Sequence, residues 1–154
     1  MSDRISRHIS LKEAIKSNTA TRLNIDNTPR ELDLIKMTEI AEKIFEPLRE
    51  WVGGPIKVNS FYRSPELNSA IGGSTSSQHC IGCALDIDDT FGHKTNAQMF
   101  DYIKNNLDFD QMIWEFGDDD ECDWVHVSYI SEETNRRRLL KATKINGRAN
   151  YRII

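Results

Sequence analysis

The sequence predicts an α+β domain with a small antiparallel sheet flanked by helices. Helix-type spacing of apolar residues is found mainly in the first half of the chain, and short alternating segments typical of half-buried strands are found mainly in the second. The later strands are arranged as hairpins, which does not favour a repeated βαβ fold. With 154 residues, 38% hydrophobic and 29% charged, the chain fits one domain spanning residues 1–154.

Two helices are expected near the start of the chain. Residues 11–16 form a short one behind a serine cap. Residues 29–52 form a longer one, where Thr28 precedes a proline at the first helical position and Glu31 completes a Thr-x-x-Glu capping box. Its apolar residues recur at spacings of about three and four, which gives the helix one core-facing stripe. Pro47 is expected to kink its last turns.

The rest of the chain is expected to alternate between strands and short helices. Strands are predicted at residues 56–60, 84–88, 111–116, 124–129 and 139–145, the last of them an edge strand, and helices at residues 65–71 and 95–106. The segment 84–88 alternates clearly, with Leu85 and Ile87 on one face and Asp86 on the other. That pattern points a carboxylate away from the core.

The net charge makes nucleic acid an unfavourable partner. A net charge of −4 does not favour a dedicated nucleic-acid binder, whose affinity must come from neutralising phosphates. Residues 134–154 nevertheless carry seven basic residues and no acidic one. This segment is either a solvated strand face or a surface that favours an anionic polymer.

The sequence also indicates the cellular compartment in which the chain is made. No apolar run is long enough to span a bilayer, and the first ten residues lack the apolar core of a secretory signal, so we expect cytoplasmic synthesis and no membrane insertion. The cysteines are odd in number, which fits reduced thiols better than a disulfide framework. Cys80 and Cys83 form a Cys-x-x-Cys pair, for which thiolate zinc binding or redox chemistry is the alternative interpretation.

Two polar segments carry the residues for a metal site. The first runs from Ser77 through His79 to Asp86, and the second contains Asp123 and His126. Histidine nitrogen and aspartate oxygen are common zinc ligands, and a catalytic zinc site uses three protein ligands and one open position. The sequence therefore predicts one zinc ion per chain, bound by His79, Asp86 and His126.

These segments resemble the zinc D-Ala-D-Ala carboxypeptidases and dipeptidases and the L-Ala-D-Glu endopeptidases of the hedgehog-like peptidase fold. The matching pattern is Ser-x-His-x-x-Gly-x-Ala-x-Asp, followed by an acid before a Trp-x-His. The resemblance also includes the segments 60–68 and 109–115 and the amino-terminal residues 19–29, and it spans roughly residues 9–129. It is closest to the small phage and prophage members.

The resemblance implies a role for each matching residue. His79, Asp86 and His126 bind zinc, and Asp123 acts as the general base that activates water and then as the acid that protonates the leaving amine. Arg63 holds a substrate carboxylate or stabilises the oxyanion. The same match implies that Ser77 hydrogen-bonds substrate. Gly82 and Ala84 are expected to be small because the backbone turns between two ligands there and a bulky side chain would crowd the metal.

The expected function is hydrolysis of peptidoglycan stem peptides by a monomer of phage or prophage type. Such an enzyme reaches the cell wall after phage-type release or as part of a virion. Many carboxypeptidase relatives have glutamate where this chain has Asp123, so aspartate favours the endopeptidase-like branch or a carboxylate closer to the metal. Glu115 shares a strand face with Ile113 and is expected to play a structural or supporting role. Arg63 could instead form a structural salt bridge.

Three alternatives remain open at this point. The chain could be a non-catalytic wall-binding or virion-assembly module that keeps the fold, although binding alone needs no general base. It could also be a cytoplasmic D-Ala-D-Ala dipeptidase. The acidic residues 118–121 are either a solvated loop or a calcium site, although they lack the spacing of a known calcium loop.

Overall fold

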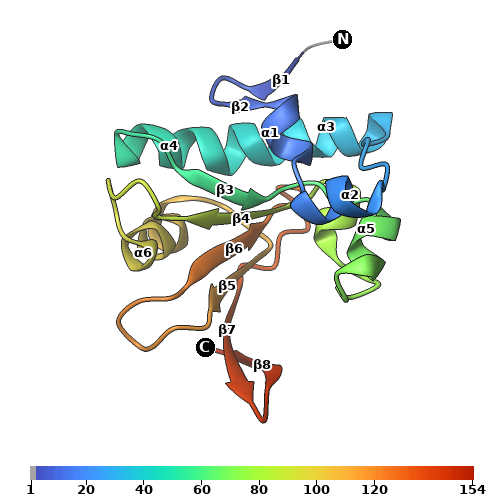
Figure 1. Cartoon of the computed structure of the whole chain (residues 1–154). Coiled ribbons are helices and arrows are strands. Elements are labelled where there is room, and N and C mark those ends of the chain that lie inside the picture. Colours follow the sequence, from blue (N-terminus) through green and yellow to red (C-terminus); the bar gives the residue numbers. More distant parts are fainter. Residues whose placement is uncertain (1–2) are drawn as a thin grey trace.

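The computed structural model describes residues 3–154 and shows a six-stranded mixed sheet with helices packed against it (Figure 1). The strand order is β3-β4-β6-β5-β7-β8. The strands are β3 (Lys57–Ser60), β4 (Ala84–Asp88), β5 (Gln111–Glu115), β6 (Trp124–Ser128), β7 (Arg138–Ile145) and β8 (Arg148–Ile153). A separate small hairpin, β1 (Arg4–Ser6) and β2 (Ile9–Ser10), lies near the amino terminus. The predicted α+β class is confirmed.

The helices lie mainly before and between the strands of the sheet. They are α1 (Leu11–Ile15), α2 (Asn18–Leu23), α3 (Glu31–Ile40), α4 (Glu46–Val52), α5 (Pro65–Ala70) and α6 (Asn96–Asn106), with a 3-10 turn, η2, at Gln78–Ile81. A π-helical turn at Ala41–Phe45 joins α3 to α4 into one helical stretch. This turn ends two residues before Pro47, which has no N–H to continue the helical hydrogen bonds. Among the described residues, none of the helices is long and apolar enough to cross a membrane.

The long helical stretch that starts with α3 begins differently from the expectation. The predicted Thr28–Glu31 capping box is wrong, because the helix starts at Glu31 with Arg30 as its cap. The buried Asp33 carboxylate accepts a hydrogen bond from the backbone N–H of Arg30 at 3.0 Å and two more from its guanidinium. Because this carboxylate binds both the backbone and the side chain of Arg30, it fixes the start of the helix there and not at Thr28 farther upstream.

The pairing of the sheet differs from the expectation at its carboxyl-terminal end. Adjacent strands are antiparallel as expected, except that β5 and β7 run parallel among residues 3–154. The segment predicted at 139–145 does form a strand, but it is not an edge strand, because β8 pairs with it on its outer side. All six residues of β8 are exposed, so no alternation of apolar and polar residues marked it in the sequence.

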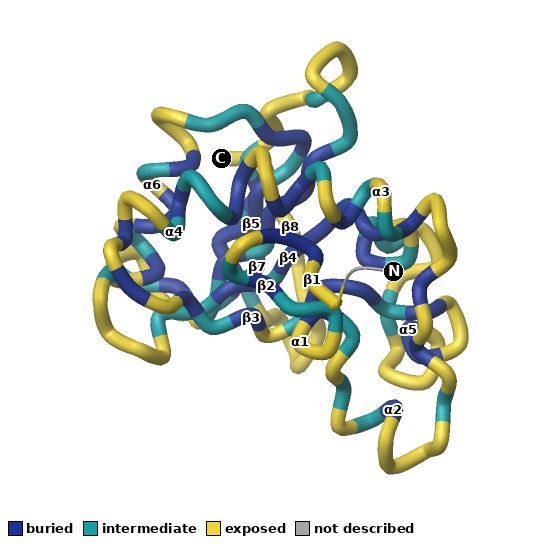
Figure 2. Tube along the Cα trace, turned by 90° about the horizontal axis from the view of Figure 1, so that it is seen from above, coloured by how far each residue is buried: buried dark blue, intermediate teal, exposed yellow. Residues whose placement is uncertain are grey.

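The two faces of the sheet have different environments. One face packs against the helices in the main core, a single buried cluster that contains Leu85 and Ile87 of β4 together with Met37 and Ile44 of the long helical stretch. Figure 2 shows the buried residues gathered in the middle of the molecule and the exposed ones along its rim. On the other face, Asp86 of β4 lies opposite His126 of β6 in the register of the sheet. The alternation predicted for β4 therefore separates the core from a polar face.

Replacing Gly82 by alanine is expected to destabilise the fold by about 2–4 kcal/mol. Gly82 follows η2 with a φ of +76°, and a Cβ there would lie 2.5 Å from the backbone oxygen of Asp33. The small residue is therefore required by contact with α3 and not by the metal site itself. Denaturant unfolding measures the loss. Gly147→Ala is the control: its φ is +77°, but a Cβ would meet nothing within 4 Å. Equal losses for both variants would contradict the role of the close contact.

Candidate metal centre

The 3-10 turn η2 presents His79 to the polar face of the sheet. Ser77 caps this turn, its Oγ accepting a hydrogen bond from the His79 backbone N–H at 3.3 Å. The imidazole is only 1% exposed. Its Nδ1 lies 2.7 Å from the carbonyl oxygen of Phe61. Because a carbonyl can only accept, Nδ1 carries the proton, and Nε2 is left with a free lone pair.

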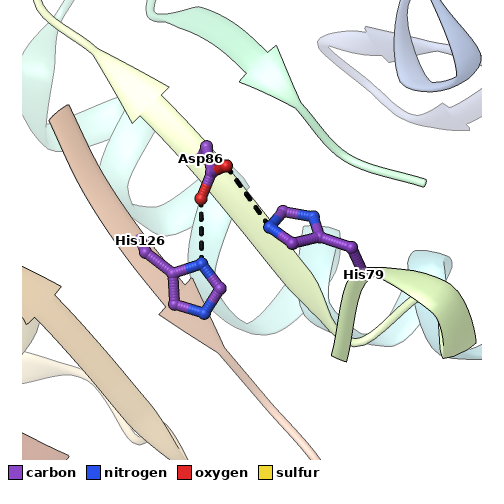
Figure 3. A group of neighbouring side chains, drawn as sticks. All are labelled: His79, Asp86 and His126. Carbon is purple, nitrogen blue, oxygen red and sulfur yellow. Dashed lines mark hydrogen bonds and ion pairs between the residues drawn. The ribbon is translucent and has the colours of Figure 1, made fainter. Parts of the chain in front are cut away.

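Asp86 and His126 meet His79 from two neighbouring strands (Figure 3). In the register of β4 and β6 they are directly opposite each other, and His126 Nδ1 lies 2.9 Å from Asp86 Oδ1. His79 Nε2 lies 3.3 Å from Asp86 Oδ2. One possible ligand atom from each residue falls within 4.8 Å of the others. The structure thus brings together the three residues that the sequence predicted as metal ligands.

The protonation states of this group suit a metal. Burial lowers the pKa of His79, against the opposing effect of Asp86, which favours the neutral imidazole. Burial by itself would raise the pKa of Asp86, but the two histidines outweigh it and hold the pKa well below its usual value. Neutral imidazole and ionised carboxylate are the forms that bind metal ions.

The donor set fits zinc. Two imidazole nitrogens and one carboxylate oxygen are a combination found at catalytic zinc sites, where a fourth position stays open. In addition, Nε2 of His79 is buried and has no hydrogen-bond partner among the described residues. An unpaired buried nitrogen costs free energy unless something binds it. A bound cation would satisfy this atom, and Phe61 would then be the outer partner that orients the ring.

A family model described as Peptidase M15 matches residues 7–128, which include all three of these side chains. The chain belongs to the peptidase M15 family. The M15 family is zinc-dependent, so membership together with the His–Asp–His group supports a zinc-dependent peptidase. The family named by the sequence resemblance is thereby confirmed. No curated protein matches the chain.

The M15 metal group lies in a cavity of about 630 Å³. The residues that line it come from the segment after β3, from η2 and the loop before it, from the four strands β4, β5, β6 and β8, and from the segment before β7. They are Arg63, Gly72, Gly73, Ser74, Ser76, Ser77, Gln78, His79, Asp86, Gln111, Ile113, Glu115, Trp124, His126, Arg136 and Tyr151. Two of these residues, Gln78 and Arg136, are held together on one side of the cavity, because both donate hydrogen bonds to the buried Asp110 carboxylate.

Arg63 stands in this cavity without a counter-ion. Its backbone N–H donates to the carbonyl oxygen of His79 at 3.3 Å, which ties the residue to the turn that carries the first ligand. Its Nε is buried without a hydrogen-bond partner, and within residues 3–154 its guanidinium forms no salt bridge. The alternative role of Arg63, a structural salt bridge, therefore has no acidic partner among residues 3–154. The charge is available to a ligand.

The structure places Glu115 in the cavity and the side chain of Asp123 outside it. Asp123 lies directly before β6, where its backbone N–H donates to the Glu115 carbonyl at 2.8 Å, but its side chain is exposed and does not line the cavity. Glu115 lies at the end of β5, opposite Trp124, and does line it. The catalytic role of Asp123 stays a prediction, and Glu115 becomes a second candidate for it.

Glu115 has the properties of a proton-transfer group. It is 5% exposed, and its carboxyl makes no hydrogen bond or ion pair within the part of the chain that the structure describes. Burial raises its pKa to about 7, although His126 acts in the opposite direction. In the sequence, Glu115 is an acid among apolar residues of a predicted strand, and it shares a strand face with Ile113. Such an acid is unusual enough in a core to indicate function.

The cysteines and the acidic loop do not join the metal group. The thiols are free, and burial raises the pKa of Cys83 to about 11 and that of Cys122 to about 12, which disfavours the thiolate form that binds zinc. Residues 118–121 form no cluster of potential metal ligands in the described range 3–154. Within this loop the Asp118 carboxylate accepts hydrogen bonds from the backbone N–H groups of Asp120 and Glu121.

Proposed function

We propose that the protein hydrolyses the stem peptides of bacterial peptidoglycan, as a D-Ala-D-Ala carboxypeptidase or as an L-Ala-D-Glu endopeptidase. The observation that carries the proposal is the presence, in one open cavity, of a His–Asp–His metal group and an unpaired guanidinium. Stem peptides bear carboxylates close to the bonds that these enzymes cut, and a guanidinium fork binds a carboxylate through two parallel hydrogen bonds. Membership of the M15 family supports the same substrate class.

Each residue of the site has a role in the proposed reaction. The chemistry that a zinc ion held by His79, Asp86 and His126 would supply is polarisation of the scissile carbonyl. Glu115, a buried carboxyl that lines the cavity, takes a proton from the attacking water and gives it to the leaving amine. Arg63 holds a carboxylate of the substrate and so fixes the position of the scissile bond.

The resemblance also assigns roles to Asp123 and Ser77, and both roles stay proposals. Asp123 is the other candidate for the proton transfer, and an acid-to-amide exchange at each carboxylate separates the two. Ser77 is proposed to bind substrate, because its Oγ accepts from His79 and its own hydroxyl proton stays available to donate.

The biological setting is also a proposal. We propose synthesis in the cytoplasm of a phage-infected or lysogenic cell, followed by action on the wall after phage-type release or as part of a virion. The partner is the peptidoglycan peptide, with no role for nucleic acid or membrane insertion, and the active form is a monomer. The resemblance to small phage and prophage enzymes is the support for this setting.

Digestion of purified muropeptides tests the function and identifies the bond. Mass analysis of the products is expected to find either free D-Ala, which indicates a carboxypeptidase, or a new amino-terminal D-Glu, which indicates an endopeptidase. Muropeptides that stay intact while the protein binds cell walls would contradict the proposal and favour a non-catalytic binding module.

Arg63→Lys is expected to keep the fold and the zinc content but to lower kcat/KM by about 10–100-fold, the equivalent of one charge-assisted hydrogen bond. A lysine keeps the charge but cannot form two parallel hydrogen bonds to a carboxylate. Arg22→Lys in α2, outside the cavity, is the matched control. Steady-state kinetics on a muropeptide measures both variants. Parental activity in Arg63→Lys would return this residue to a structural role.

A further inference from the structure

The carboxyl-terminal hairpin supplies one wall of the cavity. The family match ends at residue 128, so β7 and β8 lie beyond it. Nevertheless, Tyr151 of β8 lines the same cavity as His79, Asp86 and His126. The M15 site of this chain is therefore extended by a hairpin that follows the matched region.

The register of the sheet explains how Tyr151 reaches the cavity. Trp124, Glu115, Ala142 and Tyr151 lie in one line across β6, β5, β7 and β8. The buried Ala142 stands between the carboxylate and the phenol, and its small side chain leaves room above β7. A larger residue at this position would separate the tyrosine from the cavity.

The phenol lies nearer to the site than the strand order suggests. Three strands separate β8 from β4, a distance of about 19 Å in a flat sheet with strands 4.8 Å apart. Yet the cavity joins Tyr151 to Asp86. The pKa of Tyr151 is raised by burial first and then by the charges of Glu115 and Asp86. The side chain of Tyr151 therefore reaches the cavity that contains the metal group, although it starts from a strand at the edge of the sheet.

Tyr151 is equipped to bind a ligand. It is 52% exposed, and its hydroxyl has no hydrogen-bond partner among residues 3–154. Ile113, which also lines the cavity, packs with Leu140 and Ala142 in a small apolar cluster. Tyr151 thus offers one unused hydrogen-bond donor on an aromatic ring, in a cavity that also contains an apolar side chain.

We infer that Tyr151 is a substrate-binding residue of this chain, which donates a hydrogen bond to a carbonyl or carboxylate oxygen of the stem peptide while its ring covers an apolar side chain. The inference rests on the proposed function. It adds a second polar contact for the peptide in the cavity that Arg63 also lines.

Tyr151→Phe tests the inference, since it removes only the hydroxyl. The variant is expected to keep the parental zinc content and kcat, and to raise KM by about 2–10-fold, the range for one neutral hydrogen bond. Tyr102→Phe is the matched control, because Tyr102 stacks on Trp51 away from the cavity. Parental KM in Tyr151→Phe, with an active parent, would overturn the inference.

A second measurement does not depend on catalysis. In metal-free protein labelled with ¹³C at the tyrosine rings, the signal missing from the Tyr151→Phe spectrum belongs to Tyr151. A stem tetrapeptide is expected to shift this signal and to leave that of Tyr102 unchanged. If the parent cleaves no muropeptide, the proposed function fails, and the titration still decides the inference. A shifted Tyr151 signal supports it, and an unshifted one overturns it.

Discussion

Exchange of Glu115 for glutamine is expected to slow peptide hydrolysis by about 10²–10⁴-fold, the usual contribution of a general acid–base group. Glutamine has nearly the same size, so it fills the same buried site at the end of β5, but its amide can neither take nor give a proton. Glu115 is not one of the three residues of the metal group. The zinc content is therefore expected to stay at the parental level. Single-turnover hydrolysis of a muropeptide and metal analysis on the same sample measure both quantities.

Asp123→Asn is the matched control, since it makes the same acid-to-amide exchange at an exposed residue three positions before His126. The position of Asp123 outside the cavity predicts a small effect on the chemical step. The reverse result, a large loss in Asp123→Asn and parental activity in Glu115→Gln, would show that the residue named by the family resemblance is the proton-transfer group.

Removal of one metal ligand has the second large effect. His126→Ala is expected to weaken zinc binding by more than about 10²-fold, which exceeds the usual loss for an outer-sphere partner, and to abolish measurable hydrolysis at low zinc. The variant leaves His79 and Asp86 in place, and two ligands hold zinc far less tightly than three. Competition with a chromophoric chelator measures the affinity.

His93→Ala serves as the control for a lost imidazole, because His93 is exposed and belongs to no metal group in the described residues. Its zinc affinity is expected to equal that of the parent. If His126→Ala also binds zinc as tightly as the parent, the ion is held elsewhere, and the assigned centre is wrong.

The metal group could be predicted from the sequence because local patterns determine it. The alternation of residues 84–88 assigns Asp86 to the polar face, and the same rule places His126 on the polar face of β6. Antiparallel pairing of these two strands then puts the side chains opposite each other. The tautomer of His79 was not predictable, because it depends on the carbonyl of Phe61, a contact between segments that the sequence pattern does not relate.

The burial of Glu115 could not be predicted from the sequence, and the catalytic role of Asp123 that the resemblance implies stays a prediction. The environment of a carboxylate depends on which strands pack around it. Glu115 is buried because β7 pairs in parallel with β5 on the side away from β6. That parallel pairing joins two strands between which β6 lies in the chain. No residue pattern in either segment predicts the pairing.

The strand β8 escaped prediction for a different reason, although its partner β7 was expected at residues 139–145. Each residue of β8 is exposed, so the strand has no buried face to produce an alternating pattern. Its basic residues indicated only a solvated surface or an anionic partner. Tyr151 therefore had no visible connection to the site until the register of the sheet was known.

Hydrolysis by one preparation in three states tests the central claim most directly: the protein as purified, after removal of metal with a chelator, and after addition of zinc. The account predicts that a muropeptide is cleaved by the first sample, left intact by the second and cleaved again when about one zinc ion per chain has bound. Undiminished cleavage by the metal-free sample would contradict the assignment of a zinc peptidase.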